Sequence, residues 1–380
     1  MAGHNIFEQT VKAFLKPIEE YLQNEKCSEI MINGKDHVYI EERGLLKRAP
    51  VKFPDEKSLL ACVKNIAQYM GREITEQSPR LDAHLPDGSR VHIIIPPISQ
   101  NGICLAIRKF TKEILTFEKL VSFGSMSQKL SDLLKMIVTV KKNLIVSGGT
   151  SSGKTSLLNG VSGVIDPSQR ILVMEDAAEL QLNQEHVVRL QTRPADRYGE
   201  NAVTMFHLLM SAMRMRPDRI IIGEIRGAEA LDLCLSMTSG HGGSMSTVHA
   251  NTPLDACQRM ETLAMMSPIG LPLRAIRSQV ASAIEVIVQA ARLEDGSRKV
   301  THISEVLPLS EDGDYVIRDL MKFYRSGKDP DGKVVGYHDT TGKLPTFFHE
   351  LQQYGFNIEK DWFVPEHRRT KKAAAEAGAH

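Results

Sequence analysis

Residues 143–156 read NLIVSGGTSSGKTS, and this stretch decides the fold. Asn143 to Ser147 is a short apolar run with β-branched residues, which predicts a buried strand. The next eight residues, GGTSSGKT at 148–155, match the pattern G-x-x-x-x-G-K-[ST] without departure. A helical pattern begins at Ser156. A strand, a glycine-rich turn and a helix in this order predict a loop that binds phosphate groups.

The residue types in this loop suit a nucleoside triphosphate. Gly148 and Gly153 allow backbone angles that are closed to other residues, so successive N–H groups can point at a phosphate. Lys154 would reach the β- and γ-phosphates, and the hydroxyl of Thr155 would hold Mg²⁺. The expected nucleotide-binding residues are Gly148, Gly149, Thr150, Ser151, Ser152, Gly153, Lys154, Thr155 and Ser156. The alternative is a glycine-rich turn that only caps a helix.

Length and composition narrow the class of protein. A chain of 380 residues predicts about two domains, at most three. Lysine plus arginine number 47 against 46 aspartate plus glutamate, so no global basic field points to nucleic acid. The five cysteines are scattered without a C-x-x-C pair, which argues against a zinc site or disulfide framework and fits a reducing cytoplasm.

Targeting and membrane segments are not expected. Glu8 and Lys12 interrupt the N-terminal stretch where a signal peptide needs an apolar run. No apolar stretch approaches the roughly 20 residues of a membrane helix. Association with a membrane would therefore depend on other proteins.

Before the phosphate loop, the chain mixes strands and helices. Strands are expected at Glu29–Ile32 and His37–Glu42, with a helix that starts at Pro54-Asp55 and ends near Gly71. A helix at 5–24 is interrupted by Pro17. Strand character returns within 81–110. We therefore predict an α+β N-terminal domain over 1–110.

From residue 126 the pattern becomes an alternation of helix and strand. This alternation predicts an α/β domain over 126–310, with a mostly parallel sheet that binds nucleotide at the carboxyl ends of its strands. Two further strands, VIVQAARL and KVTHISEVL, are expected across an Asp295-Gly296 turn. Residues 111–125 are interpreted as a linker between the two domains.

The end of the chain differs in composition from the rest. Residues 311–365 are expected to form a small, partly ordered C-terminal appended segment. Residues 366–380 have no apolar residue larger than alanine and predict a disordered tail.

Acidic residues follow two of the predicted buried strands. Glu175 and Asp176 end the strand RILVME, where carboxylates can position Mg²⁺ or water beside a triphosphate. Glu224 follows the strand RIIIG and is the candidate general base that takes a proton from attacking water. The alternatives are acids that stabilise a helix N-terminus for the pair, and a solvated acid at a strand end for Glu224.

Histidines and arginines supply the remaining candidates. His249 ends a predicted strand, and the glycines around His241 leave its imidazole free to approach a ligand; such a histidine can sense a γ-phosphate. Arg90 and Arg108, in the N-terminal domain, are candidates for a residue that stabilises charge in phosphoryl transfer. Each of the four can also be an ordinary core or surface residue.

Several motifs together resemble a known family. GGTSSGKTSLLN, ILVMEDAAELQL, RMRPDRIIIGEIRGAEALD and GHGGSMSTVHANTP occur in this order, with LPDGSRVHIIIPP and CLAIRKF before them. They are similar to motifs of the secretion traffic ATPases, the motors of type II and type IV secretion and of type IV pili. The chain most resembles the CpaF/TadA branch, which drives Tad-type pili. It lacks the four-cysteine zinc insert usual in type II members, and Gly242 stands where this branch is expected to have an acid.

The resemblance adds roles residue by residue. Lys154 and Thr155 fall in the Walker A loop, and Glu175 and Asp176 in a motif similar to the aspartate box. Glu224 lies in a motif that resembles an atypical Walker B strand. His249 lies in a motif that resembles the histidine box, and His241 precedes that motif. Arg90 and Arg108 match the positions from which the family supplies interdomain arginines. The fold implied is an N-terminal domain joined to a RecA-like ATPase domain, six around a pore.

The function implied is that of an ATP-hydrolysing motor that uses ATP and Mg²⁺. The resemblance implies a homo-hexamer in the cytoplasm, held at the inner membrane by a platform protein of a pilus or secretion machine, with no direct nucleic-acid contact. One alternative is the branch of type IV secretion that transfers DNA or protein. Another is a nucleotide-gated scaffold with little turnover.

Overall fold

The structure is a computed structural model of the chain, and it describes residues 10–42, 44–110, 115–196 and 199–366. The chain divides into two compact units. One comprises residues 1–113 with 195–201, and the other comprises residues 114–194 with 202–380. No helix within the described residues is both long and apolar enough to cross a membrane.

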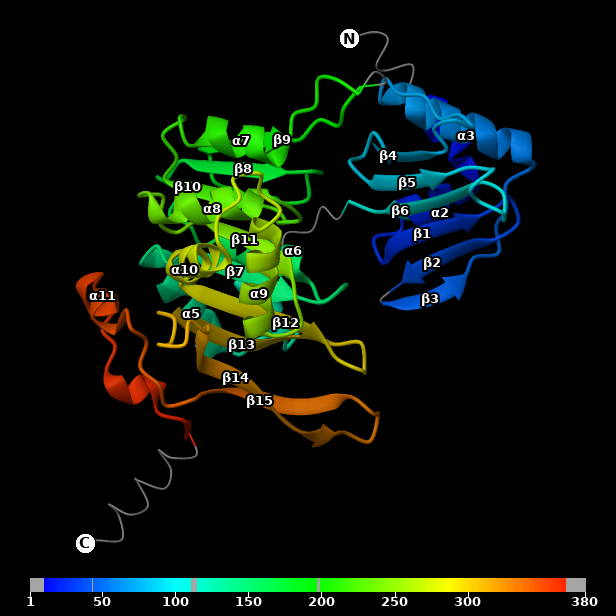
Figure 1. Cartoon of the computed structure of the whole chain (residues 1–380). Helices are drawn as coiled ribbons and strands as arrows, with labels where there is room; N and C mark the ends of the chain where they lie inside the picture. The colour runs from blue at the N-terminus through cyan, green and yellow to red at the C-terminus, as the bar shows by residue number, and fades with distance from the viewer. Residues whose placement is uncertain (1–9, 43, 111–114, 197–198, 367–380) are drawn as a thin grey trace, which may run out of the picture. The chain divides into compact units, whose positions relative to one another are not determined.

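The first unit is built on an antiparallel sheet whose strand order is β3-β2-β1-β6-β5-β4 (blue to cyan in Figure 1). The strands are β1 (Cys27–Asn33), β2 (Val38–Glu42), β3 (Leu45–Arg48), β4 (Arg80–His84), β5 (Arg90–Ile94) and β6 (Cys104–Arg108). Burial alternates along the inner strands, and Ile30 and Ile32 of β1 are buried while Asn33 is exposed; the edge strand β3 is exposed throughout. This alternation places one face of the sheet on an apolar core and leaves the other polar.

Helix α3 (Glu56–Tyr69) covers the core face of this sheet. Its buried residues recur at helical spacing and pack in the same apolar cluster as the strands; they are Leu59, Cys62, Val63, Ile66 and Ala67. The Asp55 side chain accepts a hydrogen bond from the Ser58 N–H at 2.6 Å and so caps the helix. Pro17 interrupts the preceding helical stretch, where a short 3-10 turn, η1 (Lys16–Ile18), precedes α2 (Glu19–Gln23).

The second unit is built on a nine-stranded sheet in the order β15-β14-β13-β12-β7-β11-β10-β8-β9. Its six parallel strands are β7 (Leu144–Gly148), β8 (Ile171–Glu175), β9 (Val187–Gln191), β10 (Arg219–Ile222), β11 (Met245–His249) and β12 (Val286–Arg292). Three antiparallel strands extend it: β13 (Arg298–Leu307), β14 (Val316–Lys328) and β15 (Val334–Thr340). The two strands expected across the Asp295-Gly296 turn are β12 and β13, and that prediction is therefore confirmed.

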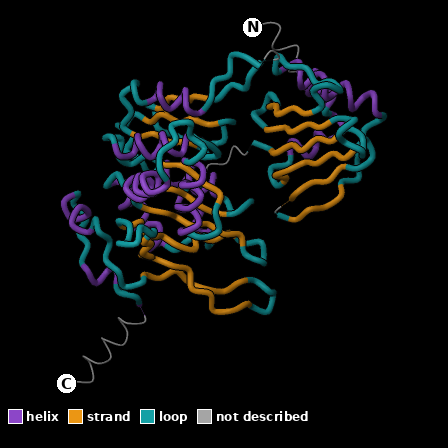
Figure 2. The backbone as a smooth tube through the Cα atoms, viewed as in Figure 1, coloured by secondary structure: helices purple, strands orange, loops and turns teal. Residues whose placement is uncertain are grey.

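Helices cover both faces of this sheet (Figure 2). Val146 packs in one apolar cluster and its neighbour Ile145 in the other, as alternation along a buried parallel strand requires. The helices of the first cluster are α4 (Phe117–Ser122), α5 (Gln128–Thr139), α6 (Lys154–Ser162) and α11 (Phe348–Gln353). Those of the second are α7 (Met205–Ala212), α8 (Glu229–Thr238), α9 (Pro253–Ala264) and α10 (Leu273–Ala283).

The expected linker at 111–125 differs from the structure in its second half. Residues 111–114 lie outside the described residues. The following stretch forms α4, whose Phe117 and Leu120 are buried in the same core as β7. Because these two apolar side chains pack against the second unit, residues 116–122 belong to that unit rather than to a connection.

The expected appended segment at 311–365 is instead part of the second unit. Its strands β14 and β15 extend the main sheet, and α11 is followed by a 3-10 turn, η2 (Lys360–Phe363). Phe348 and Phe363 are buried in the core that also holds β7. The sequence suggested a separate segment because glycines and charged residues punctuate these strands. Of the expected tail, residues 367–380 lie outside the described residues.

The amino ends of the parallel strands meet in a tightly bonded polar layer. Arg219 begins β10, is 1% exposed, and donates hydrogen bonds to the carbonyls of Val138 (2.6 Å) and Gly243 (3.2 Å). The side-chain oxygen of Asn143 accepts hydrogen bonds from the N–H groups of Gly243 (2.9 Å) and Ser244 (3.1 Å). Buried polar groups that are bonded in this way fix the strand starts in register.

Candidate functional site

The glycine-rich loop lies at the carboxyl end of β7 and leads into α6. A Cβ atom on Gly148 would lie 2.4 Å from the Ser152 hydroxyl and 2.5 Å from the Ala290 carbonyl oxygen, so only glycine fits there. Gly153 has φ of +88° and Ser151 has φ of +57°, which places both in the left-handed region. The loop is therefore tightly curved, and such a turn brings successive backbone N–H groups together in the way that suits a phosphate group.

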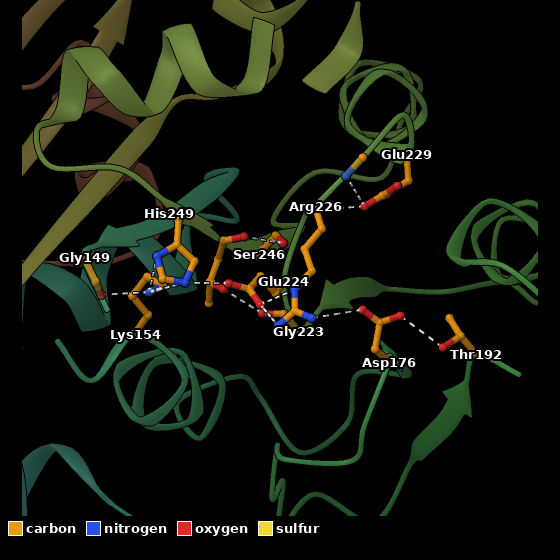
Figure 3. Close-up of polar contacts among 12 residues, drawn as sticks. Gly149, Lys154, Asp176, Thr192, Gly223, Glu224, Arg226, Glu229, Ser246 and His249 are labelled. Carbon is orange, nitrogen blue, oxygen red and sulfur yellow. Dashed lines mark hydrogen bonds and ion pairs between the residues drawn. The ribbon is translucent and has the colours of Figure 1, made fainter. Parts of the chain in front are cut away.

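Lys154, the first residue of α6, is 8% exposed and turns back over the loop. Its Nζ donates a hydrogen bond to the Gly149 carbonyl at 3.0 Å. The same Nζ lies 3.4 Å from Nδ1 and 3.3 Å from Nε2 of His249, at the carboxyl end of β11 (Figure 3). The predicted lysine, at the start of α6, and the predicted histidine, at the end of β11, thus meet beside the loop.

Glu224 extends this contact. It follows β10, its side chain is 18% exposed, and its Oε1 lies 3.1 Å from Nε2 of His249. Burial, followed by the charge of Lys154, lowers the pKa of His249. The lowered pKa favours the neutral imidazole, in which one ring nitrogen can donate to Glu224 while the other accepts from Lys154. Lys154, His249 and Glu224 form one connected polar chain (Figure 3).

Arg226 links this chain to Asp176. Its Nε donates to Oε2 of Glu224 at 2.5 Å, and its Nη1 lies 3.9 Å from Oδ2 of Asp176. The Thr192 hydroxyl donates to Oδ1 of Asp176 at 3.0 Å. Figure 3 shows Asp176 on the far side of Arg226 from Lys154. The acid after β8 thus joins the network through an arginine.

Glu175 has a different environment from Asp176. It is buried, and its Oε1 accepts hydrogen bonds from the N–H groups of Glu179 and Leu180, each at 2.9 Å. A Cβ on Gly223 would lie 3.0 Å from Cγ of Glu175, so the side chain packs directly against the residue that precedes Glu224. Burial raises the pKa of Glu175 to about 7, although the two backbone N–H groups oppose the shift.

The other predicted residues are distributed as follows. Thr155 and Ser156 lie in the first turn of α6. Arg90 and Arg108 lie in the first unit, directly opposite each other on β5 and β6. His241 precedes the amino end of β11, and therefore lies at the opposite end of that strand from His249. His241 therefore does not join His249 beside the glycine-rich loop, because the length of β11 separates the two histidines.

Two arginines of the site were not predicted. Arg226 and Arg259 line a pocket of about 400 Å³ together with Glu224, Ile225 and His249. Arg226 stands two residues after Glu224 within GEIRG, and that spacing is the signal that could have found it. Arg259 lies on α9, and no local motif points to it. Both bring positive charge to the carboxylate and imidazole of the site.

Side chains near the glycine-rich loop offer oxygen atoms that could bind a divalent cation. Within the described ranges, no group of three or more His, Cys, Asp or Glu side chains is arranged to hold a metal ion. Thr155 offers a hydroxyl and Asp176 a carboxylate, which are oxygen donors of the kind that Mg²⁺ takes together with phosphate oxygens and water. These types of donor suit Mg²⁺ bound with a nucleotide rather than Mg²⁺ in a cage of protein ligands.

Comparison with known proteins identifies relatives along most of the chain. The family described as "Type II/IV secretion system protein" matches residues 12–314. A Mycobacterium tuberculosis protein with a provisional name as a conjugal transfer protein is 34% identical over 293 residues, covering 76% of this chain and 83% of the relative. The type IV secretion system protein VirB11 of Bartonella henselae is 33% identical over 339 residues, covering 79% of this chain and 95% of that protein.

A solved structure supports the fold independently. The ATPase DotB of Legionella pneumophila aligns with a TM-score of 0.53 at 16% identity, covering 80% of this chain and 82% of DotB. At this identity the likeness concerns the fold alone. The predicted α/β class, with an N-terminal α+β domain followed by a RecA-like domain with a mostly parallel sheet, is confirmed.

Proposed function

The chain belongs to the type II/IV secretion system protein family, a family of ATPases, and we propose that it is an ATP-hydrolysing hexameric motor. The motor would power the assembly of a Tad or type IV-like pilus, or of a related secretion system. The observation that carries this proposal is the connected chain Lys154–His249–Glu224 beside the glycine-rich loop. Hydrolysis of a phosphoanhydride uses a cation that stabilises phosphate charge and a base that accepts a proton from water. Here the imidazole of His249 joins an amine and a carboxylate that could play these two parts.

Each residue of this chain has a distinct proposed role. The loop at 148–156 binds the phosphates through its N–H groups, and the Lys154 amine stabilises charge on the β- and γ-phosphates. Glu224 is the general base that takes a proton from the attacking water. His249 holds the Glu224 carboxylate toward Lys154 and responds when the γ-phosphate leaves.

The remaining candidates act around this core. Mg²⁺ bound with the nucleotide would neutralise phosphate charge, and Thr155 and Asp176 are the residues proposed to hold it. Glu175 packs against Gly223, which precedes Glu224. We propose that it assists catalysis by supporting the backbone that carries Glu224. Arg90 and Arg108 are proposed to complete the phosphate site. Like charges on paired strands repel, so an anion between them would relieve a cost of a few tenths of a kcal/mol or more.

We place the working protein in the cytoplasm at the inner face of the inner membrane, as a homo-hexamer bound to a platform protein. Nucleotide turnover would move the first unit relative to the second and so drive pilus extension, with or without retraction. The resemblance of the motifs favours the Tad branch. The names of the relatives, a conjugal transfer protein and a type IV secretion system protein, support the alternative of DNA or protein transfer equally well. The membrane protein that co-purifies with the chain distinguishes the two.

The test is phosphate release by the purified full chain, with its mass measured with and without ATP. Lys154→Ala should lose turnover by about 10³-fold, and Glu224→Gln should bind ATP but turn over about 10²-fold more slowly. Glu311→Gln is a matched control, because Glu311 is an exposed acid between β13 and β14. Equal turnover by wild type and Glu224→Gln would remove the base assignment.

The same assay decides the alternative of a nucleotide-gated scaffold. A scaffold would bind ATP and change its mass, yet release phosphate no faster than Lys154→Ala. A mass that stays that of a monomer at all ATP concentrations would contradict the hexamer.

A further inference from the structure

An arginine far away in the sequence contacts the glycine-rich loop from the side. Arg298, the first residue of β13, donates a hydrogen bond from Nε to the Ser151 carbonyl oxygen at 3.0 Å. Its Cδ lies 3.2 Å from the position that a Cβ on Gly153 would take, so the aliphatic stem packs on the loop. Arg298 and Ser151 are separated by 147 residues of sequence, and no loop motif includes this arginine.

The contact acts at the loop's most constrained non-glycine residue. Ser151 has φ of +57°, a left-handed conformation that is unfavourable for a residue with a Cβ. In a planar trans peptide the C=O and the following N–H point in opposite directions. A hydrogen bond that holds the Ser151 carbonyl toward Arg298 therefore also holds the Ser152 N–H on the opposite side, where it donates to the Gly149 carbonyl within the loop at 3.4 Å.

The hairpin that carries Arg298 is itself held on its other side. Oδ1 of Asp295 accepts hydrogen bonds from the Ser297 N–H (2.9 Å) and hydroxyl (2.7 Å). Oδ2 of Asp295 accepts the Val334 N–H of β15 at 2.7 Å. Glu294 forms an ion pair with Arg325 of β14. The turn between β12 and β13 is thus connected to the β14–β15 hairpin. These contacts restrict the movement of the strand end that carries Arg298.

We propose that Arg298 is a positioning residue for the phosphate loop. It acts through the Ser151 peptide, so the affinity for nucleotide depends on the β12–β13 hairpin as well as on the loop itself. The proposal rests on the proposed function in one respect, namely that ATP binds at residues 148–156.

The first test separates the hydrogen bond from the packing. Arg298→Met keeps an unbranched stem against Gly153 but removes the donor, and Arg298→Lys restores a cationic donor. We expect Arg298→Met to raise the Kd and KM for ATP about tenfold, the loss of one charge-assisted hydrogen bond, with kcat within about threefold of wild type. Arg298→Lys should recover most of the affinity.

A matched control lies next in the sequence. Lys299 is on the same strand, and its Nζ donates to the Gly124 carbonyl at 2.7 Å instead of to the loop. Lys299→Ala should leave the Kd for ATP within about twofold of wild type, since it removes a contact of similar type without touching Ser151. A Kd for Arg298→Met within about twofold of wild type, at an unchanged Tm, would overturn the proposal.

A second measurement needs no nucleotide. Hydrogen exchange of the amides at 151–155 should be faster in Arg298→Met than in wild type or Lys299→Ala, because the loop loses its lateral support. Unchanged exchange would overturn the role of Arg298. If wild type binds no ATP, the proposed function fails, and this exchange measurement alone decides the proposal.

A further pair of variants covers the case in which Arg298→Met does not fold. Arg298→Lys and Arg298→Gln are then compared with wild type in the same two measurements. Wild-type values in Arg298→Lys together with weaker binding and faster exchange in Arg298→Gln support the role of the cationic donor. Equal values in all three proteins contradict it.

Discussion

The two ends of the nine-stranded sheet use the same kinds of residue for opposite purposes. At the amino ends, Arg219 and Asn143 are buried and bonded to backbone atoms, including those of a glycine-containing turn, and the Nε of Arg219 also donates to the Gln169 side chain at 2.7 Å. At the carboxyl ends, the Arg226 side chain is 52% exposed and the His249 side chain 48% exposed, and their partners are other side chains. Side-chain partners can be exchanged for a ligand, whereas backbone partners cannot be exchanged without unfolding the turn.

Each end also has a buried charged group that shows what its surroundings permit. Burial lowers the pKa of Arg219 to about 10, and this arginine keeps its charge at pH 7 among carbonyl oxygens. Burial raises the pKa of Glu175 to about 7, so this carboxyl group can take up or lose a proton near neutral pH. Burial alone therefore does not mark a functional group, whereas a pKa close to the working pH does.

The largest effect that tests this contrast is expected at Gly243, in the amino-end layer. Gly243 has φ of +80°, and a Cβ there would lie 1.8 Å from Nη1 of Arg219. Gly243→Ala should therefore lower the free energy of unfolding by about 3 kcal/mol or more, measured by urea denaturation. Nucleotide affinity of the folded fraction should not change.

Gly240→Ala is the control for this prediction. Gly240 has φ of +96° in the same turn, but nothing lies within 4 Å of its Cβ position. Gly240→Ala should lower the free energy of unfolding only by the cost of the left-handed conformation, roughly 1–2 kcal/mol. Equal losses in the two variants would show that Arg219 can move aside and that the amino-end layer is not rigid.

An intermediate effect is expected at Glu175, which lies at the carboxyl ends but is bonded to backbone. Its pKa is raised from 4.5 to about 7, so its favourable contribution is complete below pH 4.5 and is lost as the pH rises through 7. A glutamine at this position would carry no charge at any pH. The stability of Glu175→Gln relative to wild type should therefore rise by roughly 2 kcal/mol from about pH 5 to about pH 8.5, by denaturation at both values. A difference that does not vary with pH would mean that the pKa of Glu175 is the same in the folded and unfolded chain.

The smallest effect is expected from the two histidines. His249→Gln should lower ATP turnover about fivefold, because one hydrogen bond that holds Glu224 is lost or lengthened. His241→Gln, at the other end of β11, should change turnover by less than about twofold. Phosphate release measures both. A larger loss in His241→Gln than in His249→Gln would reverse the roles assigned to the two ends.

Much of this arrangement could be predicted from local sequence. The strand before Gly148, the strand before Glu175 and the strand before Glu224 are apolar runs, and parallel strands bring their carboxyl ends together. The meeting of Lys154, Glu224 and His249 follows from that geometry. What remained open was the direction of each acid: Glu175 turns to the backbone and Asp176 to Arg226.

The rest depends on contacts between distant segments. Arg259 lines the site from α9, and Arg298 contacts the loop although 147 residues of sequence separate it from Ser151. No local sequence spacing therefore predicts either contact. The separation of His241 from His249 was also not predicted, because the glycines around His241 suggest only an accessible imidazole. One of those glycines, Gly243, instead leaves room for the guanidinium group of Arg219. The strands β14 and β15 were missed as parts of the main sheet because pairing partners are not encoded locally.

The docking of the last strands and helix onto β7 has a consequence for where this polypeptide can be divided. The family match stops at residue 314, yet Met321, Phe348 and Phe363 complete the apolar cluster that also holds Leu144. A recombinant fragment trimmed at the limit of sequence similarity would leave that cluster open on one side and invite aggregation. The sequence similarity to relatives therefore ends before the folded unit does. The folded unit continues for about fifty residues beyond residue 314.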